Sequence, residues 1–141
     1  MYRVLLPIDT NEDRAKAQAA YVRNLPNSDE TVEALLLHVF TEGEGTDEAS
    51  SEVAGRKDAT RVGAVRRARE QLEEAGIEVS IIDESGDPAK QIIAEADAND
   101  VQAIVLGSKK RSPAGKAVFG SVAQAVILDS TRPVVVTDHG D

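Results

Sequence analysis

The sequence predicts a single α/β domain over residues 1–141, a Rossmann-like sandwich with a five-stranded parallel sheet and four helices on its two faces. Three observations lead to this prediction. Short, almost wholly apolar runs alternate with amphipathic helical patterns along the chain, which is typical of consecutive strand-helix-strand units. Right-handed crossovers between such units make the strands parallel. A chain of 141 residues has room for one core of ordinary size and for no second domain.

The first part of the chain predicts two strands that flank a helix. The apolar runs at residues 3–8 and 31–40 are continuous rather than alternating, which indicates strands buried on both faces. Between them, Thr10 or Asn11 can cap a helix that extends to Asn24. One stripe of this helix is apolar and is expected to face the sheet: Ala15, Ala19, Val22 and Leu25.

The middle of the chain predicts a long helix and a third strand. An acidic, glycine-bearing stretch at residues 41–52 comes first. The helical pattern then runs from about Val53 to Leu72, and Gly76 is expected as its C-terminal cap. Residues 77–83 resemble the third strand.

The last part of the chain completes the alternating pattern. Asp87 can cap a helix whose first residue is Pro88 and whose end lies near Ala98. The apolar run at residues 103–106 predicts a fourth buried strand that stops at Gly107. A helix over residues 121–130 and a strand over residues 133–137 follow.

Two connections are expected to form a pocket. Ligands of open parallel sheets bind beyond the carboxyl ends of the strands, where the strand order reverses. Pro7-Ile8-Asp9 follows the first strand, and the segment from Gly107 to Gly120 follows the fourth. Periodicity alone does not give the strand order. In the order 3-2-1-4-5, which we expect, these two connections are neighbours across the switch point.

The second of these connections has the composition of an anion site. From Val101 to Leu128 there is no Asp or Glu, although 25 of the 141 residues are acidic. Backbone N–H groups beside glycine, a helix N-terminus near Gly120 and Ser121 and a positive local field favour a bound phosphate. The alternative is a basic loop that binds nothing. The cations and the other glycines of the segment are Lys109, Lys110, Arg111, Lys116, Gly107 and Gly115.

The overall charge excludes other classes of partner. A formal net charge of −9 makes binding to nucleic acid or to an anionic membrane by overall charge unfavourable. The chain has no cysteine, and no apolar run long enough for a signal peptide or a transmembrane helix. We therefore expect a cytoplasmic protein. The excess of acidic over basic residues, with few aromatics, resembles proteins of halophiles, although an ordinary acidic bacterial protein can share it.

The usual catalytic motifs are absent. Gly115-Lys116 is not the end of a P-loop, because Lys110 and Ala117 stand where glycine and Ser or Thr are required. There is no Gly-x-Ser-x-Gly motif and no histidine-containing metal spacing, and His38 is more simply a strand-end histidine. A two-component receiver domain has the same number of elements and could use Asp83, but the paired acids after the first strand are missing. We assign no catalytic and no metal-ligating residue.

Several motifs together resemble the universal stress protein family. Gly107, Lys110, Gly120 and Ser121 occupy the positions of the family's nucleotide-binding motif Gly-x-x-Gly-x9-Gly-(Ser/Thr). The opening strand ends Pro-x-Asp at residues 7–9, the second strand reads Leu-Leu-His-Val at 36–39, Gly-Asp-Pro precedes the third helix at 86–88, and Arg-Pro-Val-Val-Val occupies 132–136. Because the motifs occur in this order, the resemblance extends over essentially the whole chain.

The resemblance implies a site for ATP or another adenine nucleotide. In that site Asp9 would approach the ribose or the adenine, and Val39 would line the adenine slot. The phosphates would be held by Gly107, Gly120 and Ser121. A Mg²⁺ ion bound through the phosphates is compatible with the sequence, which does not require it. The remaining implied site residues are Pro7, Leu106, Lys110 and Val122.

Each implied contact also has a purely structural interpretation. Asp9 can be the cap of the first helix, Gly107 a simple turn after a strand, and Ser121 the N-cap of its helix. Val39 is expected to be buried in either case. The pair Gly120 and Ser121 matches the motif most specifically.

One residue departs from the family motif. Lys110 stands where the motif has its second glycine, so a long side chain could crowd the phosphates or donate a charge-assisted hydrogen bond to them. We expect binding to be retained. The chain is then a nucleotide-responsive regulatory or stress-tolerance module, with a nucleotide-free dimeric scaffold as the alternative and a slow ATPase as the third hypothesis.

The resemblance also implies a homodimer. In this family the fifth strand commonly pairs across a two-fold axis. The corresponding edge here is apolar and would otherwise invite aggregation. The residues expected at the interface are Val134, Val135 and Val136.

Overall fold

The computed structural model describes residues 1–41, 58–108 and 119–138 of the chain. They form one five-stranded sheet with the order β3-β2-β1-β4-β5, in which every adjacent pair of strands is parallel. The predicted fold class and strand order are therefore confirmed. A receiver domain has the order 2-1-3-4-5, so the sheet excludes that alternative.

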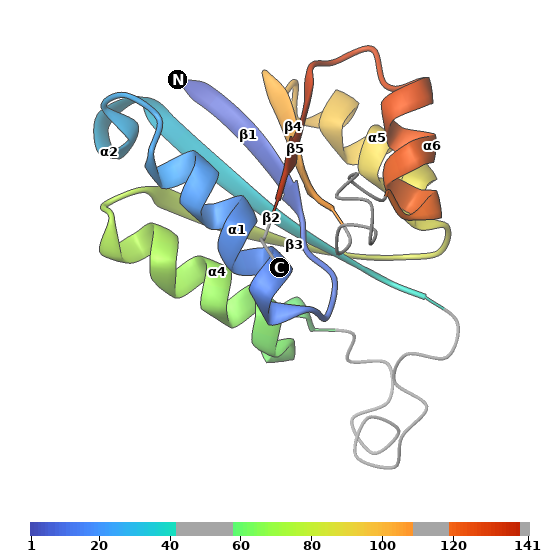
Figure 1. Cartoon of the computed structure of the whole chain (residues 1–141), viewed down its shortest axis with the longest axis horizontal. Helices are drawn as coiled ribbons and strands as arrows, with labels where there is room; N and C mark the ends of the chain where they lie inside the picture. Colours follow the sequence, from blue (N-terminus) through green and yellow to red (C-terminus); the bar gives the residue numbers. More distant parts are fainter. Residues whose placement is uncertain (42–57, 109–118, 139–141) are drawn as a thin grey trace, which may run out of the picture.

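Helices cover both faces of the sheet (Figure 1). α1 and α4 lie on one face, and α5 and α6 lie on the other. The strands are β1 (Tyr2–Pro7), β2 (Val32–Phe40), β3 (Glu78–Ser85), β4 (Ala103–Gly107) and β5 (Val134–Thr137). The helices are α1 (Glu12–Arg23), α2 (Ser28–Thr31), α4 (Gly63–Glu74), α5 (Pro88–Ala98) and α6 (Ser121–Asp129), with the 3-10 turn η1 (Ala59–Arg61).

Alternation along the central strands divides the core into two halves. On β1, Val4 and Leu6 pack toward α1 and α4, while Leu5 packs toward α5 and α6. All three side chains have an exposed fraction of 0%. Because successive residues of a strand point to opposite faces, an apolar run in a central strand fills both halves of the core.

The boundaries differ from the prediction in two places. The one-turn helix α2 stands before β2, where the sequence predicts only a strand from residue 31, and Asn27 enters it with a φ of 55°. Of the long helix predicted from about Val53, residues 53–57 lie outside the described residues. In the described part of the chain the helix α4 begins at Gly63, because Val62 is extended. The preceding residues form η1, whose first N–H, on Ala59, donates to Asp83 Oδ1 over 2.6 Å. Gly76, with a φ of 81°, follows the end of α4. The acidic stretch 42–52 lies outside the described residues.

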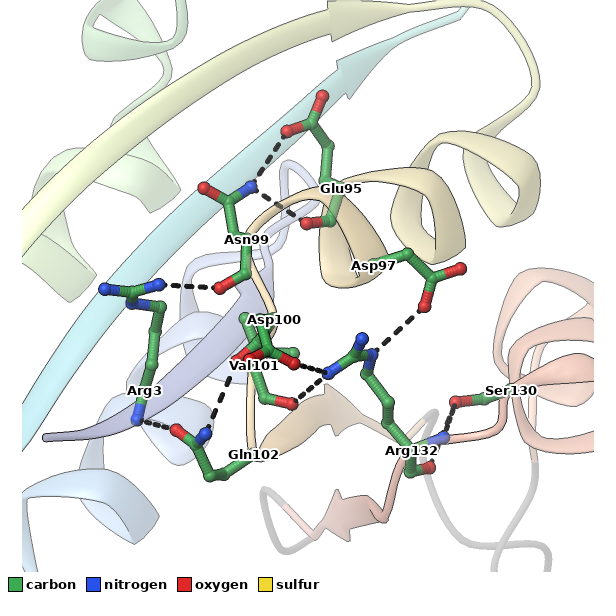
Figure 2. A network of polar contacts seen from close by, with 9 residues as sticks. All are labelled: Arg3, Glu95, Asp97, Asn99, Asp100, Val101, Gln102, Ser130 and Arg132. Carbon is green, nitrogen blue, oxygen red and sulfur yellow. Dashed lines mark hydrogen bonds and ion pairs between the residues drawn. The ribbon is translucent and has the colours of Figure 1, made fainter.

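Two arginines hold the α5–β4 connection at the amino end of the sheet (Figure 2). Arg3 of β1 donates through Nη1 to Asn99 O over 2.7 Å. Arg132, just before β5, donates to Val101 O over 2.7 Å and to the carboxylates of Asp97 and Asp100 over 3.1 Å each. Those carboxylates raise the pKa of Arg132 above its ordinary value. This network fixes the start of β5 beside β4, far along the strands from their carboxyl ends.

A pair of carboxyl groups lies between α5 and β3. A side-chain hydrogen bond to Glu84 raises the pKa of Glu95, and burial and the like charge of Glu84 act in the same direction. Asn99 Nδ2 donates to Glu95 Oε1 over 3.2 Å and acts in the opposite direction. Because the folded state favours the protonated form, this carboxyl group stabilises the fold at low pH and loses that contribution as the pH rises through its raised pKa.

Candidate ligand pocket at the switch point

A pocket of about 500 Å³ lies beyond the carboxyl ends of β1 and β4. These strands are neighbours in the sheet, and the strand order reverses between them. The volume lies within the range of about 300–1,000 Å³ that small-molecule sites occupy. Eight of the nine residues predicted for the nucleotide site line this one pocket: Pro7, Asp9, Val39, Leu106, Gly107, Gly120, Ser121 and Val122. The ninth, Lys110, lies outside the described residues. Their contacts with a nucleotide stay a prediction.

Asp9 presents a pre-oriented carboxylate at the end of β1. Its Oδ1 accepts the backbone N–H of Asn11 over 2.9 Å, and its Oδ2 accepts from Arg14 Nη1. The cap of α1 is Asn11, whose Oδ1 accepts the N–H of Arg14 over 2.8 Å. The alternative interpretation of Asp9 as the helix cap is therefore wrong, and half of its side-chain surface stays exposed to the pocket mouth and solvent (50%).

Gly107 ends β4 beneath the side chain of Arg14. A Cβ atom at Gly107 would lie 2.1 Å from Arg14 Cγ and 2.6 Å from Arg14 Cδ. Real Cβ atoms do not approach other atoms so closely, so a larger residue would have to displace the arginine. Arg14 Nε in turn donates to Ser108 O over 3.1 Å. Gly107 is thus more than a simple turn. Because glycine has no Cβ, the side chain of Arg14 can occupy the space above it.

A buried glutamine bridges β1 and β4 below the pocket. These strands pair only at Val4 with Ala103 and at Leu5 with Ile104. Beyond that point Gln18 of α1, 1% exposed, donates through Nε2 to Pro7 O over 2.7 Å and to Val105 O over 2.9 Å. The amide therefore pairs two buried carbonyl groups where the strands separate.

The opposite wall of the pocket is the N-terminus of α6. Gly120 is the N-cap, and Ser121 is the first residue of the helix, so the interpretation of Ser121 as the N-cap is wrong. Gly120 has no side chain with which to cap this end. The first N–H groups of an uncapped helix have no intrahelical partner and carry the positive end of its dipole. The residues that bear them also line the pocket, which suits this wall to an anion.

The side of the pocket nearest β2 is mostly apolar. Val39 is 9% exposed and His38 is 2% exposed, and both line the cavity. His38 Nδ1 lies 2.7 Å from Ile8 O, and its ring meets Phe40 edge-on with centroids 4.6 Å apart. Because a carbonyl oxygen only accepts, Nδ1 carries the proton in this contact. The histidine thus ties β2 to the end of β1, as expected of a structural strand residue.

Sequence reasoning missed two polar residues of α1, Arg14 and Gln18. They are four residues apart, so they lie on one face of the helix. Gln18 also falls within the stripe of Ala15, Ala19 and Val22, all of them fully buried. A polar side chain inside an apolar stripe was the available signal, because it requires buried partners. The pocket wall also includes Thr10, Thr41, Pro88 and Ile92, which the prediction did not name.

Neither a cluster of metal-ligating side chains nor a membrane-spanning helix occurs among the described residues. Among residues 1–41, 58–108 and 119–138, no group of three or more His, Cys, Asp or Glu side chains is placed to hold a metal ion. No helix in these same ranges is long and apolar enough to cross a bilayer.

The fold and the pocket define a class: an α/β protein with a pocket at the switch point of a parallel sheet, one wall of which is a helix N-terminus. The model of the Universal stress protein family matches residues 1–138. The chain belongs to the universal stress protein family.

Individual relatives agree with this assignment. The Bacillus subtilis universal stress protein YxiE is 29% identical over 149 aligned positions that cover 95% of this chain and 97% of that protein. A universal stress protein of Mycolicibacterium smegmatis is 33% identical over 82 residues, which cover 57% of this chain and only 63% of that relative. The solved universal stress protein of Archaeoglobus fulgidus superposes with a TM-score of 0.74 at 27% identity and covers 97% of this chain and 98% of its own.

Some solved proteins of this fold hold nucleotides. An A. fulgidus universal stress protein was determined with dAMP, a second universal stress protein with cAMP, and an Arabidopsis thaliana member with AMP. Their identities to this chain are 22%, 16% and 15%. For this chain they establish the fold.

Proposed function

We propose that this protein binds ATP or another adenine nucleotide in the switch-point pocket and acts as a nucleotide-responsive regulatory module. The observation that carries the proposal is the convergence of three kinds of group on one cavity: the apolar side chains of β2 and β4, the carboxylate of Asp9, and the uncapped N-terminus of α6. A nucleotide has a matching apolar base, a hydroxylated sugar and anionic phosphates.

The three groups suggest an orientation for the ligand. The apolar side near Val39 suits the adenine ring, and the carboxylate of Asp9 suits ribose hydroxyl donors. Gly120 and Ser121 suit the phosphates, because they begin α6, whose first N–H groups have no intrahelical partner. Lys110 remains part of this proposal as a phosphate contact, and a Mg²⁺ ion would then be held through the phosphates rather than by a protein cluster. The complexes of other family members with dAMP, cAMP and AMP support an adenine nucleotide as the ligand.

Native purification in potassium chloride, acid extraction and mass spectrometry provide the first test. We expect a stoichiometric adenine nucleotide in the extract, or titratable binding of ATP or AMP by calorimetry after its removal. Replacing Asp9 by asparagine weakens the acceptor for a ribose hydroxyl and is expected to raise the Kd about 10-fold. Asp29→Asn makes the same charge change at an exposed position of α2 and should leave the Kd unchanged.

An empty extract with no binding at millimolar ATP would contradict the proposal. The result would instead favour the nucleotide-free scaffold, in which Lys110 blocks the phosphates. We propose no catalytic step, and at most a slow hydrolysis of ATP. Turnover of labelled ATP that survives both Asp9→Ala and Ser121→Ala would indicate a contaminating enzyme.

We also propose a homodimer through β5. This strand is at one edge of the sheet, and Val134, Val135 and Val136 are each only half-buried in the single chain. Light scattering at high salt is expected to give twice the 15.0 kDa chain mass. Introducing lysine at both Val134 and Val136 should give a monomer with an unchanged circular dichroism spectrum, because charged edge strands resist pairing. A monomeric mass for the unmodified chain would refute the dimer.

A further inference from the structure

We propose that Arg14 is a specificity-determining residue that donates to the phosphate of the bound nucleotide, so that the pocket selects nucleoside phosphates over nucleosides. The inference rests on the proposed function, because it concerns the same pocket. It assigns a phosphate contact to a residue of α1, whereas the family's nucleotide-binding motif includes only residues from Gly107 onward.

The fold fixes the position of the Arg14 side chain. Arg14 is the third residue of α1, and its stem crosses the end of β4 in the space left by Gly107. There Nε donates to Ser108 O over 3.1 Å, and Nη1 pairs with Asp9. The guanidinium is thereby fixed at two points, and only 21% of the side chain is exposed. A cation held in this way loses little conformational entropy when it binds a ligand.

The guanidinium still has donors to offer. Arginine has five N–H donors and no acceptor. Two of the five are used, one by Ser108 O and one by Asp9, and within the described parts of the chain the other three have no partner. Arg14 lines the pocket. An arginine with free N–H groups on a cavity wall is suited to the oxygens of a phosphate, which accept its planar fork in a bidentate geometry.

The surroundings favour an anion at this place. Among the described residues that line the pocket, Asp9 is the only one with a carboxylate, and Arg14 already pairs with it. Facing the same cavity is the N-terminus of α6. The sequence from Val101 to Leu128 adds no acidic residue. The pocket therefore offers donors to an anion from two elements, α1 and α6, and the one acid in its described lining is already paired with Arg14.

The order of the groups matches a nucleoside 5′-phosphate. Asp9 and Arg14 are adjacent, one an acceptor and the other a donor. In the ligand a ribose, which offers hydroxyl donors, is adjacent to the 5′-phosphate, which only accepts. Asp9 on the ribose and Arg14 on the phosphate form a complementary arrangement that adenosine can satisfy only in part.

The test compares AMP with adenosine, each measured by displacement of a labelled AMP probe and by calorimetry. For Arg14→Met we expect the Kd for AMP to rise about 10- to 100-fold, as when a charge-assisted hydrogen bond is lost, and the Kd for adenosine to change less than about 3-fold. Arg14→Lys should retain part of the preference, since an ammonium contacts phosphate without the bidentate geometry. Arg23→Met, at the exposed far end of α1, is the matched control and should not alter either Kd.

A double variant separates contact from charge compensation. If Arg14 only neutralises Asp9, the double variant Asp9→Asn with Arg14→Met lacks both charges and should show the wild-type ratio of the Kd for adenosine to the Kd for AMP. That result would overturn the proposed contact between Arg14 and the phosphate. A ratio that stays reduced in the double variant supports it. A wild-type chain that binds AMP while Arg14→Met keeps the wild-type ratio overturns this inference alone. A wild-type chain that binds neither compound overturns the proposed function and this inference with it.

Discussion

Replacing Gln18 by leucine is expected to lower the free energy of unfolding by about 2–4 kcal/mol. Leucine has a similar volume, so the change leaves no large cavity. It removes the amide that donates to Pro7 O and Val105 O over 2.7 and 2.9 Å. A buried acceptor left without a partner costs about 1–3 kcal/mol, and two are left here. The apolar gain of a leucine side chain offsets part of this loss.

The effect should extend to the pocket, because Gln18 lies where β1 and β4 separate. The paired positions of β1 and β4 end at Leu5, and Pro7 and Val105 beyond them are joined through the amide. Without the amide, the carboxyl ends of the two strands are free to move apart. We therefore expect the Gln18→Leu variant to bind nucleotide more weakly as well as to unfold more easily.

Chemical denaturation monitored by circular dichroism measures the loss of stability. The matched control is Gln71→Leu, because the Gln71 amide makes an exposed hydrogen bond of 3.3 Å to Lys16 O on the surface between α4 and α1. Surface changes of this kind usually stay within about 0.5 kcal/mol. If Gln18→Leu cost no more than Gln71→Leu, the buried bridge would not contribute to stability as described.

Replacing Gly107 by alanine is the second change with a large expected effect. The new Cβ would overlap Arg14 Cγ and Cδ at 2.1 and 2.6 Å, so the arginine must leave its path and release Asp9 and Ser108. Overpacking of this kind costs about 1–3 kcal/mol of stability. The variant should also lose affinity for AMP, since Arg14 no longer lies on the pocket wall.

A double-mutant cycle tests the cause. In an Arg14→Ala background the overlapping atoms are absent, so Gly107→Ala should there cost less than about 0.5 kcal/mol of stability. The difference between the two backgrounds, measured by denaturant unfolding, is the coupling between the residues. An equal cost in both backgrounds would mean that the alanine acts on the backbone of β4 and that Gly107 does not serve as the passage for Arg14.

Much of the fold was predictable because it depends on local patterns. The run Leu35-Leu36-Leu37 predicts a strand buried on both faces, and β2 is such a strand. Asp87 followed by Pro88 predicts the start of a helix, and Asp87 does cap α5 by accepting the N–H of Lys90. The start of α4 was not predictable in this way, because η1 is held by Asp83 of β3, a contact with a distant part of the chain.

The pocket residues likewise fall into two groups: those that the sequence predicted and those that only the structure revealed. Those predicted for the nucleotide site follow from the resemblance to the family motifs and from the rule that strand ends meet at one edge of the sheet. Arg14 and Gln18 belong to no such motif. Arg14 and Gln18 donate to Ser108 O and Val105 O, which lie 94 and 87 positions away. The apolar stripe of α1 could indicate that Gln18 is buried, but no local pattern indicates which distant residues these two side chains contact.

The sequence by itself determined which segments are strands and helices, the family, and the residues that gather at the carboxyl edge of the sheet, because these follow from periodicity, capping and motif spacing. The split between β1 and β4 and the path of the Arg14 side chain over Gly107 were decided only by the tertiary structure. Each depends on which distant segments become neighbours. That choice is made by packing and by the pairing of buried polar groups across the whole chain.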